Sequence, residues 1–199
     1  MKKLGFSLFL AALVGLFAFT EVLPIGAPMP KAELKMADIS GKKISLKDAA
    51  GANGLLVMFS CNTCPYVVKY QERTLESGNY ALGKKIGVIV VNSNEGQRDS
   101  DDSFEAMQAY AKAQGYKWNY VVDKGSELAD AFGANRTPEC FLFDKAGKLV
   151  YHGAIDNNAN DAQSASRKHL KEAMDELLSG KEVSVKETRS VGCTIKRVG

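Results

Sequence analysis

The chain has 199 residues, of which 45% are hydrophobic and 25% are charged, as expected for one globular domain with a short extra segment. This composition excludes disordered, collagen-like and polytopic membrane proteins. The 26 basic and 23 acidic side chains give a formal net charge of +3. Because these charges are spread along the chain rather than gathered in runs, the sequence shows no nucleic-acid-binding footprint.

The first twenty residues have the pattern of an export signal. Lys2 and Lys3 precede an uncharged, mostly apolar stretch at residues 4–19. This stretch is slightly longer than a usual signal core and slightly shorter than a confident transmembrane span. We therefore expect residues 1–20 to be a cleaved signal peptide or an N-terminal membrane anchor. Either role places the rest of the protein in the periplasm or another extracytoplasmic compartment.

The segment that follows alternates between strand and helix periodicity, which predicts an α/β domain. After a proline-bearing stretch at residues 24–30, continuous apolar runs at 55–59 and 86–91 are typical of strands buried on both faces. Residues 64–76, between these runs, have the pattern of a crossover helix. A strand, a helix and a second strand in this order predict a parallel pair.

The second half of the domain is predicted to contain three helices and three strands. The helices are predicted at 103–114, 126–132 and 164–178. The strands are predicted at 120–122, 140–143 and 149–152. The last two strands flank a glycine-bearing turn, which indicates an antiparallel pair. The last helix is amphipathic and is expected to cover one face of the sheet.

The most informative motif follows the first buried strand, where Cys61-Asn62-Thr63-Cys64-Pro65 leads into a predicted helix. At a helix start, unpaired backbone N–H groups and the helix dipole favour the thiolate of Cys61. The spacing also brings Cys64 within disulfide reach. Pro65 is compatible with a first helical turn, where its missing N–H is not needed. The motif therefore predicts a reversible redox dithiol.

Other uses of these cysteines fit the sequence less well. A structural zinc site needs a second close pair, whereas Cys140 and Cys193 are single and far apart. Attachment of a c-type haem needs His directly after the second cysteine, and Pro65 stands there. Two core cysteines would suit the centre of a strand better than a strand-to-helix junction. We expect no metal and no cofactor.

Five segments carry a resemblance to a known family. They are F-S-C-N-T-C-P-Y (59–66), V-N-S-N-E (91–95), R-T-P-E-C-F-L-F-D (136–144), Y-H-G-A-I-D (151–156) and E-T-R-S-V-G-C-T-I-K (187–196). With them the chain resembles the thioredoxin superfamily, and specifically its bacterial redoxin or AhpC/TSA-like group, over about residues 25–197. The resemblance implies a thioredoxin-like domain at 25–182, with a central mixed β-sheet flanked by helices. A C-terminal tail at 183–199 then carries Cys193.

The resemblance also implies roles for site residues. Cys61 would be the exposed, attacking thiolate and Cys64 the resolving cysteine. Thr137-Pro138 would be a cis peptide beside both cysteines, where Pro138 orients the substrate and a backbone edge is open for strand pairing. Supporting positions near the sulfurs or the cis turn are Thr63, Thr137 and Glu139.

The sequence departs from the pattern of the family at several positions. Leu55 stands where thioredoxin has a buried acid, so position identifies no general base. Met58 stands where peroxiredoxins have the hydroxyl that positions peroxide, which argues against peroxidase activity. His152 is expected on a solvated edge strand, too weak a signal for a copper site. Residues 98–103 (R-D-S-D-D-S) lack the spacing of a calcium loop and are expected to be solvated.

The remaining cysteines differ in their surroundings. Cys140 lies in an apolar strand and is expected to be a buried small hydrophobe. Cys193 lies in a polar tail, where a core role does not fit. Three roles stay open for Cys193: a third redox cysteine, a partner of Cys140, or none.

These observations predict an exported thiol-disulfide oxidoreductase that exchanges disulfides through Cys61 and Cys64. Its partners would be protein thiols or disulfides and an upstream redox donor, without nucleic acid. One alternative is a thiol-dependent peroxidase, a peroxiredoxin-like antioxidant in which Cys61 becomes a sulfenic acid that Cys64 resolves. A second alternative is a non-enzymatic module that uses the dithiol to bind a metal or to dock a partner.

Overall fold

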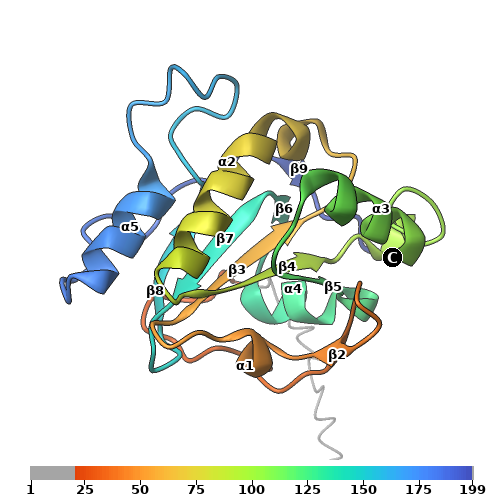
Figure 1. The fold of residues 1–199 in the computed structure, drawn as a ribbon, viewed down its shortest axis with the longest axis horizontal. Helices are drawn as coiled ribbons and strands as arrows, with labels where there is room; N and C mark the ends of the chain where they lie inside the picture. The colour runs from red at the N-terminus through yellow and green to blue at the C-terminus, as the bar shows by residue number, and fades with distance from the viewer. Residues whose placement is uncertain (1–20, 199) are drawn as a thin grey trace, which may run out of the picture.

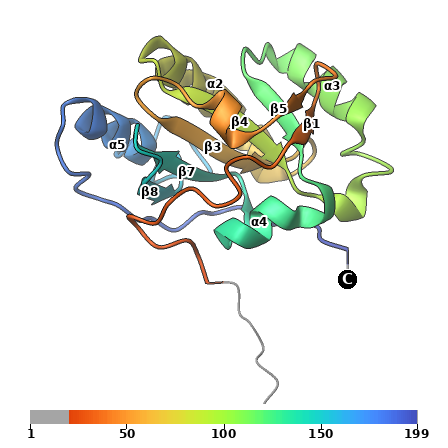
Figure 2. The ribbon, with the colours of Figure 1, turned by 90° about the horizontal axis from the view of Figure 1, so that it is seen from below.

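The structure is a computed structural model that describes residues 21–198. The segment for which export is predicted, residues 1–20, lies outside the described residues, as does Gly199. Between residues 21 and 198, none of the helices has the length and apolar character needed to span a membrane. The described chain forms one central sheet with helices on both faces (Figures 1 and 2).

Across residues 21–198 the central sheet has seven strands in the order β2-β1-β5-β4-β3-β7-β8, and β6 pairs with β9 in a second, small sheet. The strands of the central sheet are β1 (Met36–Asp38), β2 (Lys43–Ile44), β3 (Leu55–Ser60), β4 (Gly87–Asn92), β5 (Asn119–Val122), β7 (Glu139–Phe143) and β8 (Leu149–Gly153). The small sheet consists of β6 (Arg136–Thr137) and β9 (Cys193–Thr194). The helices are α1 (Leu46–Ala49), α2 (Pro65–Gly83), α3 (Phe104–Gln114), α4 (Glu127–Phe132) and α5 (His169–Leu178), with 3-10 turns at Glu95–Gln97 and Lys124–Ser126.

The centre of the sheet is the parallel pair predicted from the two apolar runs. Every residue of β3 and β4 is buried. Their register places Leu55 opposite Gly87 and Ser60 opposite Asn92, and α2 makes the crossover between them. On its other side β3 pairs with β7 in antiparallel orientation, so the mixed sheet is confirmed. The carboxyl ends of β3 and β4 consequently lie side by side.

Two apolar cores lie on opposite faces of the sheet. On one face, Leu56 and Met58 of β3 pack with side chains of α2, α3 and α5. On the other face, Leu55, Val57 and Phe59 pack with α1, α4 and the segment that precedes β1. Figure 2 shows this division, with α4 below the sheet and α2 and α5 above it. The alternation of buried side chains along β3 supplies both cores because successive strand residues face opposite ways.

The predicted helices form, with two changes in length. The helix that ends at Gly115 is observed as predicted, since Gly115 has φ of 66° and closes α3 as a left-handed cap. Helix α2 runs to Gly83, seven residues beyond the predicted end. It continues through Gly78, where a β-carbon would lie 2.5 Å from the ring of Trp118. Gly78 therefore makes room for an aromatic side chain from the strand side and does not end the helix.

Helix α5 begins at His169, five residues later than predicted. The amide of Asn157 bonds the side chain of Ser166 at 2.8 Å, and its carbonyl oxygen accepts the backbone N–H of Arg167 at 3.1 Å. These bonds from an earlier residue of the same loop hold residues 166 and 167 outside the helix. Periodicity alone does not show such competition.

Among the elements between residues 21 and 198, four strands and one helix were not predicted, and all of them are short. The helix α1 is stabilised by a capping box, in which Ser45 and Asp48 each bond the other's backbone N–H. Strands β1 and β2 extend the sheet beyond β5. Strands β6 and β9 have two residues each and pair across a large sequence separation. Two-residue strands carry no detectable alternation, so their positions are a finding of the structure.

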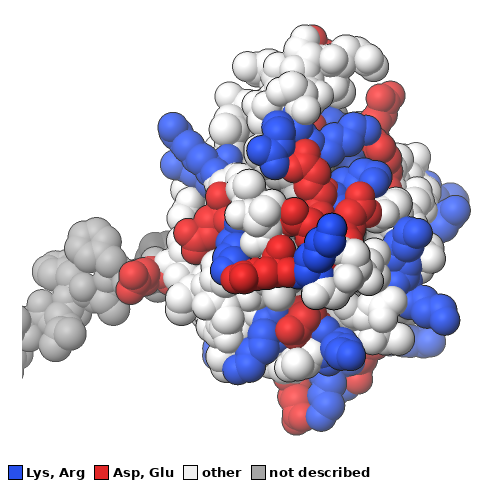
Figure 3. Space-filling model, turned by 90° about the vertical axis from the view of Figure 1, so that its left-hand side faces the viewer, with Lys and Arg blue, Asp and Glu red and all other residues white. Residues whose placement is uncertain are grey.

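The molecular surface carries charges of both signs. On the face shown in Figure 3, basic and acidic side chains are interspersed and neither sign forms a broad patch. Around α5, Arg167 pairs with Glu172, Lys168 pairs with Glu76 at 2.9 Å and Lys171 pairs with Asp175 at 2.7 Å. Such paired surface charges differ from the one-sided basic surface that nucleic-acid binding uses.

Candidate active site

The two cysteines of the motif lie at the carboxyl end of β3. Cys61 directly follows the strand, and Cys64 is the N-cap of α2 with Pro65 in its first turn. Cys61 is 2% exposed and Cys64 is 5% exposed. Together with Val67 they form a small apolar cluster, against which Cys193 packs. The predicted strand-to-helix junction therefore places the motif as expected, although both sulfurs are covered.

Cys64 forms a disulfide with Cys193, and the Cα atoms of these two residues are 6.1 Å apart. Cys61 and Cys140 are free thiols. The expectation of an exposed Cys61 is thus wrong, and in this structure Cys61 and Cys64 are not joined to each other. The physical reason for both is the C-terminal tail, which brings Cys193 against the two motif cysteines. Of the roles left open for Cys193, pairing with Cys140 does not occur here.

A cis peptide joins Thr137 to Pro138, as the resemblance implies. Thr137 contacts both motif cysteines, with its hydroxyl 3.5 Å from the sulfur of Cys61 and its carbonyl oxygen 3.4 Å from the sulfur of Cys64. The second distance is a packing contact, because a disulfide sulfur has no proton to donate. Pro138 is buried beside them. The strand β6 that ends in Thr137 therefore lies directly against the redox motif.

The surroundings of Cys61 act on its pKa in opposite directions. Burial raises the pKa of the Cys61 thiol, and the negative charge of Asp102 raises it further. The Thr137 hydroxyl and the backbone N–H groups of Cys64 and Thr63 lower the pKa by bonding the sulfur. Burial dominates, so the net shift is upward. The thiol of Cys61 is consequently held in its less reactive, protonated form while the tail covers it.

A fully buried carboxylate lies behind the motif. The Oδ1 atom of Asp102 accepts the backbone N–H of Asn62 at 2.9 Å and the amide of Asn92 at 2.8 Å. Its Oδ2 atom accepts the amide of Asn94 at 2.8 Å. The phenol of Tyr120 donates to the Asn62 side chain at 2.9 Å. This network fixes the loop between Cys61 and Cys64 from the side of β4.

The position of Asp102 corrects the expectation that residues 98–103 form a solvated loop. Asp102 is 0% exposed, because the amides of Asn92 and Asn94 supply the donors that a buried carboxylate needs. A signal for this network was present, since the segment V-N-S-N-E ends the strand parallel to β3. Adjacent parallel strands bring their carboxyl ends together, which places these amides beside Cys61.

The supporting positions fall in different places. The side chain of Thr63 is exposed, and its backbone N–H is the group that faces Cys61. Glu139 is buried and its Oε2 atom accepts the backbone N–H groups of Asn135 and Arg136 at 2.9 Å and 3.0 Å. Glu139 therefore holds the loop that leads into the cis peptide.

The expectation of a solvated His152 is wrong. His152 is 9% exposed, and its Nε2 atom lies 2.8 Å from Oε1 of Glu139. Its ring also packs on Phe141, with 4.5 Å between ring centroids. The edge of β8 is covered there by the tail, whose Lys186 carbonyl accepts the backbone N–H of His152 at 2.8 Å. His152 thus orients the carboxylate of Glu139.

Cys140 lies in β7 and is completely buried. Burial raises the pKa of its thiol, which keeps it protonated and unreactive. Its position agrees with the expectation of a small buried hydrophobe. In the described part of the chain, no group of three or more His, Cys, Asp or Glu side chains is placed to hold a metal ion.

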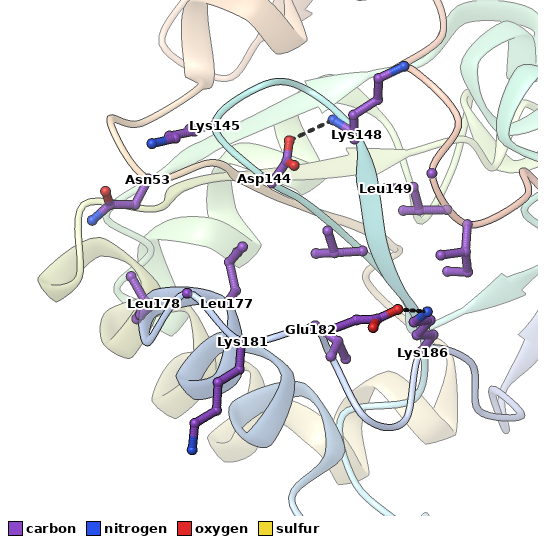
Figure 4. A pocket seen from close by; sticks show the side chains of 15 residues that line it. Asn53, Asp144, Lys145, Lys148, Leu149, Leu177, Leu178, Lys181, Glu182 and Lys186 are labelled. Carbon is purple, nitrogen blue, oxygen red and sulfur yellow. Dashed lines mark hydrogen bonds and ion pairs between the residues drawn. The ribbon is translucent and has the colours of Figure 1, made fainter.

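One broad hollow lies away from the redox motif (Figure 4). Its volume is about 650 Å³, and it is lined by the β7–β8 turn, the end of α5 and the start of the tail. The lining combines apolar side chains such as Leu149 with four lysines, Lys145, Lys148, Lys181 and Lys186. In the figure Asp144 bonds the backbone of the turn at Lys148, and Glu182 pairs with Lys186. No cysteine of the motif lines this hollow.

The family model described as Redoxin matches residues 24–168. Among curated proteins, thiol-disulfide oxidoreductase ResA from Bacillus thuringiensis is 30% identical over 148 residues, which cover 73% of this chain and 76% of the relative. Among solved structures, a hypothetical protein from Sinorhizobium meliloti superposes with a TM-score of 0.81 at 30% identity, covering 90% of this chain and 97% of that chain.

A third similarity shows the fold. The thioredoxin domain of a thiol-disulfide oxidoreductase from Bacteroides vulgatus superposes with a TM-score of 0.54 at 22% identity, covering 65% of this chain and 88% of that chain. The sheet order, the crossover helix that starts at the cysteine motif and the cis proline beside it agree with a thioredoxin-like fold.

Proposed function

The chain belongs to the redoxin family, and we propose that it is an exported thiol-disulfide oxidoreductase whose reacting groups are Cys61 and Cys64. Oxidoreductase activity follows from the family and from relatives named thiol-disulfide oxidoreductase. The assignment to Cys61 and Cys64 rests on their position at the start of α2 and on the contacts of Thr137 with both sulfurs.

In this proposal Cys61 attacks a disulfide and Cys64 resolves the mixed disulfide that results. The backbone N–H groups of Thr63 and Cys64 and the hydroxyl of Thr137 stabilise the Cys61 thiolate. Cys64 attacks the sulfur of Cys61 in the second step, which releases the substrate as a thiol and leaves a Cys61–Cys64 disulfide. Pro138 shapes the β6 edge on which the substrate backbone lies. Glu139 holds residues 135 and 136, which lead into the cis peptide, by accepting their backbone N–H groups.

The proposed substrates are protein thiols or disulfides, together with a redox donor that resets the motif. Strand β6 pairs with β9 in this structure, and once β9 leaves, the same backbone groups would be open for pairing with an extended substrate, which provides affinity with little demand on sequence. The proposed location is the periplasm or an equivalent compartment, since residues 1–20 have the pattern of a signal or anchor. Structural disulfides persist in such compartments.

The experiment that tests the function measures reduction of a model protein disulfide, with a small dithiol as the electron source. We expect Cys61→Ser to abolish the activity and Cys64→Ser to trap a mixed disulfide through Cys61. Cys140→Ala is the matched control, because this thiol is completely buried, and it should retain full activity. Unchanged activity of Cys61→Ser would overturn the site assignment.

Hydrogen peroxide distinguishes the rival function. If the reduced protein consumes peroxide much faster than it reduces the model disulfide, and Cys61→Ser abolishes the consumption, the protein is a peroxidase and the proposal fails. Export is tested separately by fusing the chain to a reporter that is active only outside the cytoplasm. Deletion of residues 4–19 should abolish the reporter signal.

A further inference from the structure

The C-terminal tail lies along the cis-proline edge as an added strand. In β9, Cys193 stands opposite Thr137 and Thr194 stands opposite Arg136, in antiparallel register. Figure 1 shows β6 and β9 beside the N-terminal end of α2, where the cysteine motif lies. Strand addition at an exposed edge is a general way for a protein to hold an extended peptide. Here the added peptide belongs to the same chain.

The fit between tail and edge is close at Gly192. A β-carbon at this position would lie 2.2 Å from the carbonyl oxygen of Thr137 and 3.2 Å from the nitrogen of Pro138. The backbone of the tail therefore approaches the cis peptide more closely than any side-chain-bearing residue would allow. The next residue, Cys193, then reaches Cys64 and forms the disulfide.

The tail is anchored on both sides of Cys193. Before it, the backbone N–H of Thr188 bonds the carbonyl of His152 at 3.0 Å, and the hydroxyl of Thr188 accepts the backbone N–H of Ala154 at 3.0 Å. After it, Ile195 is 3% exposed in the core on the α4 side of the sheet. The backbone N–H of Lys196 donates to the side-chain oxygen of Asn94 at 2.9 Å. The segment 189–194 between these anchors is held mainly by β6 and the disulfide.

The tail also occupies the surface that a substrate needs. With β9 in place, the pairing groups of β6 are used and Cys61 is covered. An external protein has access to neither. The anchors at 188 and 195 keep the tail near the site when the segment between them moves, so its effective concentration there stays high.

We propose that Cys193 is a third redox-active cysteine and that residues 189–194 act as a built-in substrate strand, which closes the site as the Cys64–Cys193 disulfide and leaves it when Cys61 displaces Cys193. This inference rests on the proposed function of Cys61 and Cys64. It adds to that function an intramolecular substrate and a closed state that precedes exchange with other proteins.

The opening step is an internal thiol-disulfide exchange. The thiolate of Cys61 attacks the sulfur of Cys64, the Cys61–Cys64 bond forms and the Cys64–Cys193 bond breaks. Cys193 leaves as a thiolate and takes up a proton through solvent, which replaces the proton that Cys61 lost. One disulfide and one thiol are present before and after the step, so no oxidant or reductant is consumed. The product is a Cys61–Cys64 disulfide beside an edge that the tail can vacate.

Alkylation of Cys61 in the oxidised full chain tests closure directly. We expect peptide mapping of the untreated protein to yield a Cys64–Cys193 disulfide and slow alkylation of Cys61. The comparison variant is Cys64→Ser, in which Cys61 stays a thiol. This variant cannot form the Cys64–Cys193 disulfide that holds the tail over Cys61, so alkylation of Cys61 should be faster, on the order of tenfold. Cys140→Ala should keep the slow rate. A native protein that maps only as Cys61–Cys64, with a free Cys193 at every redox poise, would overturn the proposal.

A second variant opens the edge without touching a cysteine. Gly192→Ala forces a β-carbon against the Thr137 carbonyl and should displace the tail strand, so that initial reduction of a model protein disulfide becomes faster. Gly83→Ala is the matched control, since a β-carbon there meets nothing within 4 Å, and it should behave as the unmodified chain. Equal rates for Gly192→Ala and Gly83→Ala would contradict a gating tail.

The two proposals fail in different ways. If Cys61→Ser retains protein-disulfide reduction, the function assigned to the motif fails. If Cys61→Ser is inactive while Cys193→Ser and Gly192→Ala both match the unmodified chain in rate and in Cys61–Cys64 disulfide content, the motif stands and only the role of the tail fails. Circular dichroism of each variant confirms that the rates compare folded proteins.

Discussion

Two residues, Asp102 and Thr137, shift the pKa of the Cys61 thiol in opposite directions. Burial is the largest cause of its raised pKa, and the charge of Asp102 adds to the effect. The hydroxyl of Thr137 lies 3.5 Å from the sulfur and lowers the pKa. Substitutions at these two positions should therefore move the pKa of Cys61 in opposite directions, which a general loss of structure would not do.

Replacing Asp102 should make Cys61 more reactive. Asp102→Asn removes the negative charge that disfavours a second anion nearby, so the pKa of Cys61 falls and the thiolate fraction at neutral pH rises. The measurement is the pH dependence of Cys61 alkylation in the fully reduced protein, followed on the Cys61 peptide by mass spectrometry. Asp99→Asn, in the same loop but exposed, is the control and should leave the profile unchanged. A shift of the Asp102→Asn profile to higher pH would refute this electrostatic account.

Replacing Thr137 should make Cys61 less reactive. Thr137→Val keeps the shape of the side chain but removes the hydroxyl that bonds the sulfur, so the pKa of Cys61 rises further. The same alkylation profile should move to higher pH, and protein-disulfide reduction at neutral pH should slow. If Thr137→Val and Asp102→Asn shift the profile in the same direction, repacking of the loop and not charge explains both.

At the scale of elements, the middle of α2 is tied to the loop after β8 by a buried ion pair. The guanidinium of Arg73 lies 2.6 Å from the carboxylate of Asp156, and their side chains are 9% and 3% exposed. Tyr70 donates to the same carboxylate at 3.2 Å, and Arg73 stacks on its ring at 3.8 Å. This pair holds the helix whose N-cap is Cys64.

Breaking the buried pair should destabilise the protein strongly. Asp156→Ala leaves the buried charge of Arg73 with backbone carbonyls as hydrogen-bond acceptors but without a counter-charge, which costs about 3–5 kcal/mol of unfolding free energy. Urea denaturation measures the loss. The control is Glu76→Ala, which removes a pair with Lys168 whose side chains are more than half exposed and should cost less than about 1 kcal/mol. Similar losses of unfolding free energy for both variants would contradict this prediction, because Arg73 would then be paired with another group or hydrated when Asp156 is removed.

The elements also show how far the sequence predicts this molecule. The buried runs of β3 and β4 and the span of α3 were evident, because each depends on residues that are neighbours in the chain. The cysteine motif and the cis proline were likewise recognisable. The burial of Asp102 and the covering of Cys61 depend instead on pairings with Asn94 and Cys193, and local periodicity contains no information about such partners.

At the scale of the whole molecule, a disulfide at the active site links the C-terminal tail to the start of α2. The disulfide from Cys64 to Cys193 spans a sequence separation of 129 residues. Closing so long a loop restricts the unfolded chain much more than a disulfide between Cys61 and Cys64 would. The stability of the protein should therefore report which disulfide is present.

Reduction should lower the stability of the unmodified chain markedly. A cross-link over 129 residues is worth about 5 kcal/mol in the chain-entropy model, so the urea midpoint should fall clearly when a dithiol is added. In Cys193→Ser the long loop cannot close, and the effect of the dithiol should shrink to the smaller contribution of a Cys61–Cys64 bond, about 2 kcal/mol. Cys140→Ala should keep the full effect, because this thiol takes part in neither bond. A midpoint of the unmodified chain that does not respond to the dithiol would show that the long-range disulfide does not form in solution, and the tail would then be held at the cis-proline edge by backbone pairing alone.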